Sequence, residues 1–261
     1  MGVLNITPDS FSDGGQFVDQ RAARQQAERM LEEGATIIDI GGESTRPGAT
    51  PVSAEEELQR VLPTVRAMVA AGALVSIDTS KPEVMRAALE AGAQLINDVH
   101  ALRLPGALAA AAQSHAALCL MHMQGEPRSM QQAPRYDDVV VEVAGFLAAR
   151  VAACEQVGVA RERLIVDPGF GFGKTLDHNL ELLRRMGELA PSGLPLLAGL
   201  SRKSMLGAIT GRKVEERLAG SLALAYAALE GGARIIRCHD VAATRDVLRV
   251  WSALRGAGGL S

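Results

Sequence analysis

The stretch LIVDPGFGFGKT, residues 164–175, decides the fold that we expect for this chain. An apolar run ends in a single carboxylate, Asp167, and three glycines then alternate with two phenylalanines. A short buried strand that ends in Asp and opens into a glycine-rich turn is typical of a parallel α/β protein that presents a side chain to a ligand. The glycines allow the backbone to approach a flat or charged group closely, and Phe172 is placed to lie against that group.

Two other interpretations of this stretch have to be weighed. Its end, GKT at residues 173–175, matches the last part of a phosphate-binding P-loop, but the first glycine of that motif would have to be Pro168. A nucleotide-binding loop is therefore disfavoured. A plain tight turn with a surface Asp fits the stretch taken alone, and the rest of the chain has to decide between that turn and a ligand site.

Outward from this stretch, a pattern of apolar strand, polar tip, loop and helix repeats along the chain. The predicted strands lie at residues 3–6, 36–40, 74–77, 95–98, 117–121, 164–166, 195–200 and 234–239. Helices are predicted between them from helical apolar spacing and from start signals, including residues 19–33, 53–72, 106–114, 139–154, 218–229 and 241–255. Eight short strands alternating with helices favour an α/β fold of the (β/α)8 TIM barrel type over an open doubly wound sheet. The whole chain, residues 1–261, is expected to form one domain.

Composition excludes several classes of function. The chain has 261 residues, 48% of them hydrophobic, and a net charge of −3, which gives no sign of a nucleic-acid or anionic-membrane partner. No apolar run approaches the roughly 20 residues of a membrane span and no signal peptide is visible, so we expect a cytoplasmic protein. Cys119, Cys154 and Cys238 match no zinc spacing and are expected to be buried, reduced thiols.

Polar residues at the predicted strand ends are the candidate site. In a (β/α)8 barrel the C-terminal ends of all eight strands face one mouth. One polar tip alone is more often a turn or a helix cap than a ligand-binding group. Here every strand has such a tip, and the set is Asn5, residues 39–45, Asp78, Asn97, Met121 with His122, Asp167, Lys203, and Arg237 with His239. Their number and variety favour a binding site.

One part of this set suits a flat, donor-rich heterocycle such as a 2-aminopyrimidinone ring. A carboxylate accepts two N–H bonds from the amide edge of such a ring, and an Asn amide donates and accepts at once. The acceptor-rich residues are Asp78, Asn97 and Asp167. Apolar walls are available from Val99, Met121 and Phe172.

A second part of the set suits a polyanion such as diphosphate. Arg237, His239 and Asn5 are rich in donors, and the amide of Asn5 can also offer an oxygen to Mg²⁺. Lys203 is able to neutralise a carbonyl or a carboxylate. From residue type alone, a solvated loop charge explains Lys203 equally well.

Eight segments carry a family resemblance that spans residue 1 to about residue 250. They are NITPDSFSDGG (5–15), GESTRPG (42–48), DTSK (78–81), IND (96–98), MHMQG (121–125), DPGFGFGK (167–174), SRKS (201–204) and RCHDV (237–241). In this order they resemble the motifs of the bacterial dihydropteroate synthase family of pterin-binding TIM barrels. Each motif alone is weak, whereas the ordered set is highly specific.

The resemblance implies a Mg²⁺-dependent transferase of folate biosynthesis that is a target of sulfonamides. Such an enzyme joins 6-hydroxymethyl-7,8-dihydropterin diphosphate to 4-aminobenzoate, which gives 7,8-dihydropteroate and releases diphosphate. The implied partners are these small-molecule substrates and a second copy of the chain in a homodimer, and the implied cofactor is Mg²⁺.

The same resemblance implies roles for the residues at matching positions. The pterin would be bound by Asp78, Asn97, Met121, Asp167, Lys203 and Arg237. The diphosphate would be bound by Asn5, Arg237 and His239, with Asn5 contacting the metal. The aminobenzoate would be bound by Thr45, Arg46, Pro47, Phe172, Ser201 and Lys203. Asp78, Lys203 and Arg237 would be the catalytic residues, and diphosphate would leave before the amine attacks, so we nominate no nucleophilic Ser or Cys.

Two alternative functions remain open at this point. A pterin-binding methyltransferase shares the barrel and part of the pterin pocket, but it does not need the two loop motifs or the SRK segment at residues 201–203. A catalytically silent pterin-binding paralogue is expected to lose loop or metal residues, and Asn5, Thr45, Arg46 and Lys203 are all present.

Overall fold

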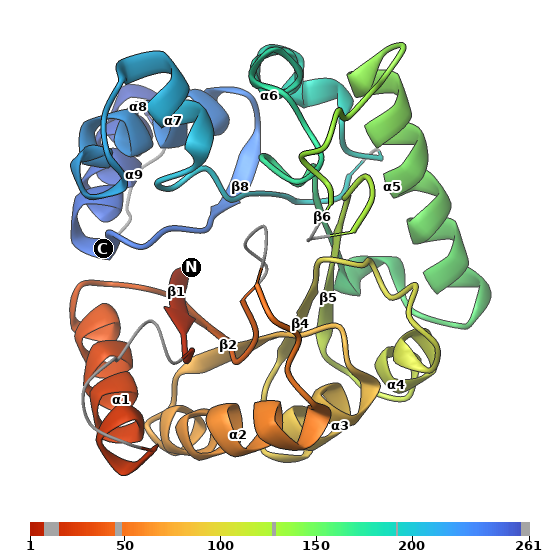
Figure 1. Cartoon of the computed structure of the whole chain (residues 1–261), viewed down its shortest axis with the longest axis vertical. Coiled ribbons are helices and arrows are strands. Elements are labelled where there is room, and N and C mark those ends of the chain that lie inside the picture. Colours follow the sequence, from red (N-terminus) through yellow and green to blue (C-terminus); the bar gives the residue numbers. More distant parts are fainter. Residues whose placement is uncertain (8–15, 45–48, 127–128, 192, 257–261) are drawn as a thin grey trace.

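The computed structural model describes residues 1–7, 16–44, 49–126, 129–191 and 193–256. Its centre is a parallel sheet whose eight strands follow one another in chain order, with helices around the outside (Figure 1). A parallel bridge between Gly2 and Cys238 brings the first strand beside the segment after the last one. Two backbone hydrogen bonds support it, Val3 N to Cys238 O at 3.0 Å and Cys238 N to Met1 O at 2.9 Å. The predicted single-domain (β/α)8 barrel is therefore confirmed.

The strands lie within one or two residues of their predicted positions at most ends. They are β1 (Gly2–Asn5), β2 (Ile37–Gly41), β3 (Leu74–Asp78), β4 (Leu95–Asp98), β5 (Ala117–Met121), β6 (Leu164–Asp167), β7 (Leu196–Ala198) and β8 (Ala233–Ile236). The C-terminal ends of β7 and β8 fall two or three residues short of the predicted ones, because their last residues turn into the loops that carry Ser201 and His239.

The helices follow the prediction, with two additions, α6 and α7, for which no range was predicted. They are α1 (Gln16–Glu32), α2 (Ala54–Ala70), α3 (Pro82–Glu90), α4 (Ala107–Ala112), α5 (Val139–Gln156), α6 (Leu176–Arg184), α7 (Ser204–Thr210), α8 (Leu218–Glu230) and α9 (Val241–Leu254). The short helix α7 was not predicted, since its seven residues include Gly207 and are too few for a helical apolar pattern. It starts directly after Lys203 and ends at Gly211 in a left-handed conformation.

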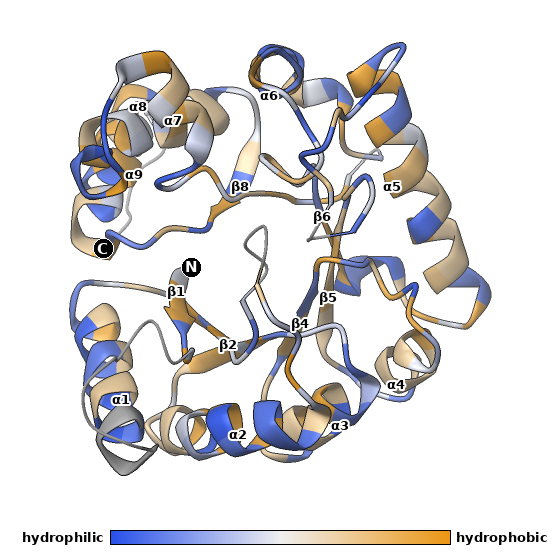
Figure 2. Ribbon diagram, viewed as in Figure 1, coloured by the Kyte–Doolittle hydropathy of each residue, from blue (hydrophilic) through white to orange (hydrophobic). Residues whose placement is uncertain are grey.

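Strand residues alternate between two apolar environments. Outward-facing residues such as Ile96, Leu118 and Val166 pack with the helices in one large core. The inward-facing set forms a separate small cluster inside the barrel, made of Leu95, Cys119, Ile165 and Leu197. Each fully buried Leu or Ile contributes about 1.5–3 kcal/mol. Figure 2 shows hydrophilic and hydrophobic residues alternating along α2, as expected of a helix with one buried side.

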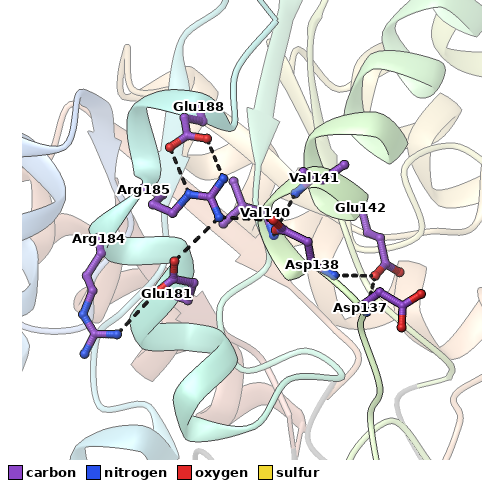
Figure 3. A network of polar contacts seen from close by, with 9 residues as sticks. All are labelled: Asp137, Asp138, Val140, Val141, Glu142, Glu181, Arg184, Arg185 and Glu188. Atoms are coloured by element: carbon purple, nitrogen blue, oxygen red, sulfur yellow. Dashed lines mark hydrogen bonds and ion pairs between the residues drawn. The ribbon is translucent and has the colours of Figure 1, made fainter.

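Surface charges hold α5 and α6 beside each other (Figure 3). Asp138 is the N-cap of α5 and accepts hydrogen bonds from the backbone of Val140 and Val141. Arg185, at the end of α6, lies 3.3 Å from Asp138 Oδ2 and 2.7 Å from Glu188 Oε2. Exposed ion pairs of this kind contribute little to stability individually. Here they link α5 and α6, the helices that precede and follow the glycine-rich turn in the chain.

Helix α9 packs against α8 through a polar contact at its C-terminal end. Trp251 Nε1 donates to Glu230 Oε1 at 2.7 Å, and Arg255 NH2 lies 2.9 Å from Glu230 Oε2. The Arg255 guanidinium also lies 5.8 Å from the centre of the Trp251 ring. The single tryptophan of the chain therefore reports on the last βα unit.

The state of the three cysteines agrees with the prediction made from the sequence. Cys119, Cys154 and Cys238 are free and buried, as predicted. Across the described ranges, none of the helices is long and apolar enough to cross a membrane.

Candidate active site

A pocket opens at the C-terminal ends of the strands, where the polar tips were expected to meet. Its lining residues are Asp78, Asn97, Val99, Met121, Asp167, Gly169, Phe170, Phe172, Gly199, Lys203 and Arg237. All six residues that the resemblance implies for pterin binding are among them, and so are the three apolar wall residues. The structure brings these side chains together, whereas the role of each one stays a prediction.

Arg237 reaches across the barrel from the segment after β8 to two carboxylates. Its Nε lies 2.6 Å from Asp39 Oδ2, and its NH2 lies 2.7 Å from Asp78 Oδ2. Asn97 Nδ2 donates to the same Asp39 oxygen at 3.1 Å. One fully buried carboxylate on β2 therefore orients both Arg237 and Asn97.

Asp39 belongs to the predicted set of polar strand ends, and the structure shows the two partners that it orients, Arg237 and Asn97. It interrupts the apolar run of β2 with a charge, and a buried charge is costly unless it is paired. Its second oxygen, Oδ1, and the hydroxyl of its strand neighbour Ser76 have no hydrogen-bond partner among the described residues. Both atoms belong to inward-facing residues below the pocket.

The electrostatics of this cluster favour charge on Arg237. Burial alone would lower the pKa of Arg237, but the carboxylates of Asp39 and Asp78 raise it above its ordinary value. Burial raises the pKa of Asp78 to about 7, against the opposing effect of the Arg237 guanidinium. The charge on Asp78 near pH 7 therefore depends on Arg237 and on what binds beside it.

Asp167 stands at the tip of β6, as predicted, without an ion pair among the described residues. Its Oδ1 accepts a hydrogen bond from the backbone N–H of Gly169 at 2.7 Å. Burial raises its pKa, and the Gly169 bond and the Lys203 charge act in the opposite direction. The carboxylate is held at one oxygen by the turn that follows it, which leaves acceptor capacity for a ligand.

Lys203 lies on the other side of the pocket, at the start of α7. Its Nζ lies 4.2 Å from the centre of the Phe172 ring. Within the described ranges no side chain or carbonyl oxygen bonds to this Nζ. Burial and then the Arg237 charge lower the pKa of Lys203 to about 8.

Ser201 and His239 do not line the pocket and instead contact each other. His239 Nδ1 lies 3.0 Å from Ser201 Oγ, and the His239 backbone N–H donates to the same oxygen at 3.2 Å. Burial, followed by the charges of Arg237 and Arg202, lowers the pKa of His239 to about 4, so its ring is neutral near pH 7. Ser201, expected to bind aminobenzoate, and His239, expected to bind diphosphate, are thus joined by this hydrogen bond.

Asn5 ends β1 in the same layer of the barrel as the pocket. The strand register pairs Asn5 with Gly41, Gly41 with Asp78, and Asp78 with Asn97. No group of three or more His, Cys, Asp or Glu side chains that could hold a metal occurs in the described part of the chain. A lone amide oxygen fits Mg²⁺ that takes its other ligands from phosphate and water, and it does not make an all-protein metal site.

Three expected aminobenzoate residues, Thr45, Arg46 and Pro47, lie outside the described residues. The two ends of their segment are tied together, because Val52 N donates to Glu43 Oε1 at 3.2 Å. Lys81 Nζ lies 2.5 Å from both Glu43 and the fully buried Glu57. Through Lys81, the N-cap of α3, residue Glu43 at one end of this segment is therefore connected to α3.

Lys174 shows why the P-loop interpretation does not apply. Its ammonium is 2.9 Å from Gly169 O and 3.0 Å from Phe172 O, and the residue is almost completely buried. Thr175 is the N-cap of α6, where its side chain accepts from His178 N. The GKT end of the stretch is therefore a lysine turned into its own loop and a helix cap.

A larger hollow lies at the opposite end of the barrel, away from the cluster of buried charges at the strand C-termini. It is about 530 Å³ in volume and lies between α3 and α4, next to the residues that precede β4 and β5. The buried polar atoms that lack a partner in the described chain all lie elsewhere. We therefore place the candidate site at the strand C-termini.

Comparison with known proteins agrees with this placement. The family model described as "Pterin binding enzyme" matches residues 1–239. The dihydropteroate synthase of Escherichia coli K12 is 54% identical over 258 residues, covering 98% of this chain and 92% of the relative. The Haemophilus influenzae dihydropteroate synthase is 53% identical, covering 98% and 94%.

Solved structures show the same relationship. The Yersinia pestis dihydropteroate synthase in a sulfonamide drug complex matches with a TM-score of 0.94 at 50% identity, covering 98% of this chain and 94% of that one. The Burkholderia cenocepacia enzyme complexed with 7,8-dihydropteroate gives 0.90 at 52%, covering 98% and 91%. Near-full-length identity, a shared barrel and the ordered motifs have one explanation: the chain belongs to the pterin-binding enzyme family, as a member of the dihydropteroate synthases.

Proposed function

We propose that this chain condenses 6-hydroxymethyl-7,8-dihydropterin diphosphate with 4-aminobenzoate to form 7,8-dihydropteroate and diphosphate. The observation that carries the proposal is one pocket that combines Asp78, Asn97 and Asp167 with two cations, Lys203 and Arg237. The Xanthomonas albilineans relative solved with 4-aminobenzoic acid, 53% identical and with a TM-score of 0.92 over 98% of this chain and 92% of that one, supports the choice of amine.

The acceptors of the pocket suit the pterin ring. Asp167 offers an oxygen to the amino and ring N–H groups of a pterin, since one of its oxygens is already fixed by Gly169. Asn97 is oriented by Asp39 and can both donate and accept at the ring edge. Met121 and Val99 supply apolar contact for the ring faces.

Arg237, His239 and Asn5 are proposed to receive the diphosphate. Arg237 keeps its charge because two carboxylates flank it, and that charge stabilises the negative charge that develops on the departing oxygens. Mg²⁺, when bound through Asn5 and the diphosphate, would neutralise further negative charge there. The C–O bond to diphosphate breaks before the new bond forms, and Asp78 lies near the resulting pterin methylene cation as an anionic partner.

The amine of 4-aminobenzoate is the nucleophile in this scheme. It forms the C–N bond to the pterin methylene and then loses a proton, so no covalent enzyme intermediate is needed. Phe172 and Lys203 form one side of the pocket where a benzoate ring and a carboxylate can be placed. Ser201, Thr45, Arg46 and Pro47 are proposed to complete that side.

A homodimer and a cytoplasmic location are also part of the proposal. Apolar side chains are exposed on and next to the late helices, which supports an interface there: Ile209, Val214, Leu218, Val250 and Leu254. Sedimentation of the purified chain tests the dimer, and a monomer at micromolar concentration would contradict it.

The central experiment measures diphosphate release by the purified chain given the pterin diphosphate, 4-aminobenzoate and Mg²⁺. Each component is omitted in turn, and dihydropteroate is quantified in parallel. Release that requires all three, with dihydropteroate formed in equal amount, is the expected result. No dihydropteroate in the complete mixture, despite pterin binding by calorimetry, would contradict the proposed reaction.

A further inference from the structure

Lys174 is a buried cation that the proposed chemistry does not use. Its three nearest hydrogen-bond acceptors are Gly169 O at 2.9 Å, Phe172 O at 3.0 Å and His122 Nδ1 at 2.9 Å, and the carbonyl oxygen of His122 lies farther away at 3.5 Å. Lys174 is 3% exposed and His122 is 6% exposed. Because Lys174 is buried and its ammonium is bonded to protein atoms, its hydrogen bonds are made within the protein and not to solvent.

The three acceptors determine how the protons are distributed. An ammonium has three donors and no acceptor, so it can bond to two carbonyls and one ring nitrogen at once. His122 Nδ1 then has to be the unprotonated nitrogen, with the ring proton on Nε2. Burial and the Lys174 charge lower the pKa of His122 to about 3, which agrees with a neutral ring.

The bonded carbonyls belong to the turn that forms one wall of the pocket. Gly169 donates its N–H to Asp167 Oδ1 at 2.7 Å, and the ring of Phe172 lines the pocket beside Lys203. The backbone N–H of His122 donates to Asp167 O at 3.0 Å. Lys174 and His122 therefore fix both the carboxylate and the aromatic ring from the side opposite to the pocket.

Other contacts hold different atoms of this turn. Tyr136 OH donates to Gly173 O at 2.8 Å, and Gly171 N donates to Asn179 Oδ1 at 2.7 Å. The Gly169 carbonyl also accepts the N–H of Phe172 at 3.1 Å. Among the described side chains, Lys174 is the one that bonds the carbonyls of Gly169 and Phe172.

We propose that Lys174, together with its acceptor His122, is a positioning residue that keeps Asp167 in the geometry that binds the pterin substrate and holds Phe172 on the aminobenzoate side of the pocket. It contacts neither substrate. The identity of the ligand rests on the proposed function, whereas the positioning role rests on the contacts of the turn.

The test compares four variants of the full chain. In Lys174→Met the donors are lost, and we expect the KM for the pterin diphosphate to rise about tenfold to a hundredfold, because small displacements of binding groups have effects of this size. We expect kcat to change less than KM, since Asp78 and Arg237 lie outside the turn and Lys203 contacts the turn from the pocket side. His122→Leu should reproduce the KM effect, and His122→Asn, which retains an acceptor near the Nδ1 position, should restore most of the binding.

Arg163→Met is the matched control. Arg163 also bonds backbone carbonyls, Ala116 O at 2.8 Å and Ala111 O at 3.1 Å, but these precede β5 at the far end of the barrel. It should lower the thermal midpoint and leave the pterin KM unchanged. A pterin KM at the wild-type value in both Lys174→Met and His122→Leu, or an equal rise in Arg163→Met, would overturn the proposal.

Two further measurements keep the outcomes separate. If Lys174→Met does not fold, the His122→Leu and His122→Asn pair decides the question. Calorimetry with 6-hydroxymethyl-7,8-dihydropterin follows binding without turnover, and the same loss and recovery of affinity are expected. If the wild-type chain binds this pterin but forms no dihydropteroate, the proposed function fails while the affinity series still tests the positioning role.

Discussion

Two lysines meet the glycine-rich turn from opposite sides. Lys174 has its three donors bonded to the turn and to His122, whereas the ammonium of Lys203 lies over the Phe172 ring without such partners in the described chain. Burial lowers the pKa of both, to about 7 for Lys174 and to about 8 for Lys203. The two lysines have similarly lowered pKa values but differ in bonded donors, and this difference supports the prediction of a structural role for Lys174 and a ligand-binding role for Lys203.

Replacement of Lys203 should have the largest effect. We expect Lys203→Ala to reduce turnover by about a hundredfold or more, since a preorganised charge in a pocket is lost, with a thermal midpoint close to that of the wild type. Asp167→Asn, on the opposite wall of the pocket, should reduce turnover by a similar factor. Steady-state kinetics and circular dichroism check both variants, and near-normal turnover in either would show that the residue has been misassigned.

Two glycines allow the two sides of the turn to be compared directly. Gly169 has a φ of +67°, and a Cβ there would lie 1.9 Å from His122 O, on the Lys174 side. Gly171 has a φ of +80°, and its Cβ would meet Lys203 Cδ at 3.3 Å, which is a flexible methylene. We expect Gly169→Ala to lower the free energy of unfolding by about 2–4 kcal/mol and Gly171→Ala by about 1 kcal/mol.

Denaturant unfolding of the two glycine variants gives this difference. Equal losses of stability would mean that the turn is not packed more tightly against His122 than against Lys203. A Gly171→Ala protein of nearly normal stability should still show weaker substrate binding, because Lys203 has to move away from the new methyl group.

The alkaline pH dependence should belong to Lys203. Its ammonium is lost as the pH rises through about 8, so the affinity for 4-aminobenzoate in the presence of a bound pterin should fall several-fold between about pH 7 and pH 9.5. His239, whose pKa is lowered to about 4, stays neutral throughout this range. Calorimetry at each pH measures this affinity. The variant Lys203→Arg should remove the alkaline decline. If the decline persists in this variant, a group other than Lys203 causes it.

The last expected effect concerns the contribution of Lys174 to stability rather than to substrate binding. Its pKa in the folded chain is lowered to about 7 from an ordinary value of 10.5, so between these values the unfolded chain binds more protons. Stability therefore rises with pH in this window, by at most about 1.4 kcal/mol per pH unit, and the full cost of the buried charge is present below pH 7. Lys174→Met should lack this rise, and parallel stability curves for variant and wild type would contradict it.

The strands and their polar tips could be predicted because both depend on short-range patterns. Apolar runs such as LIV at residues 164–166 define the strands, and the barrel's geometry then gathers Asp78, Asn97 and Asp167 at one end. The same patterns could not assign Asp39, because its function depends on the reach of Arg237 from the other end of the chain.

The orientation of the Lys174 side chain could not be predicted from the sequence either. It depends on the three alternating glycines of the turn, Gly169, Gly171 and Gly173, which adopt positive φ at +67°, +80° and +63°, and on the carbonyl that His122 presents to Gly169. Neither helical nor strand periodicity applies to such a turn, so the lysine could only be called part of a motif. The helix α7 was missed for a related reason, since seven residues contain less than two helical turns.

The position of the tryptophan determines what optical experiments on this protein can resolve. Trp251 is bonded to Glu230 between α8 and α9, and it is absent from the set of residues that line the pocket. Its emission should stay constant during ligand titrations and should change when the last βα unit separates from the barrel. Melting curves recorded by fluorescence and by far-ultraviolet circular dichroism would then diverge for any variant that loosens the glycine-rich turn before the C-terminal helices.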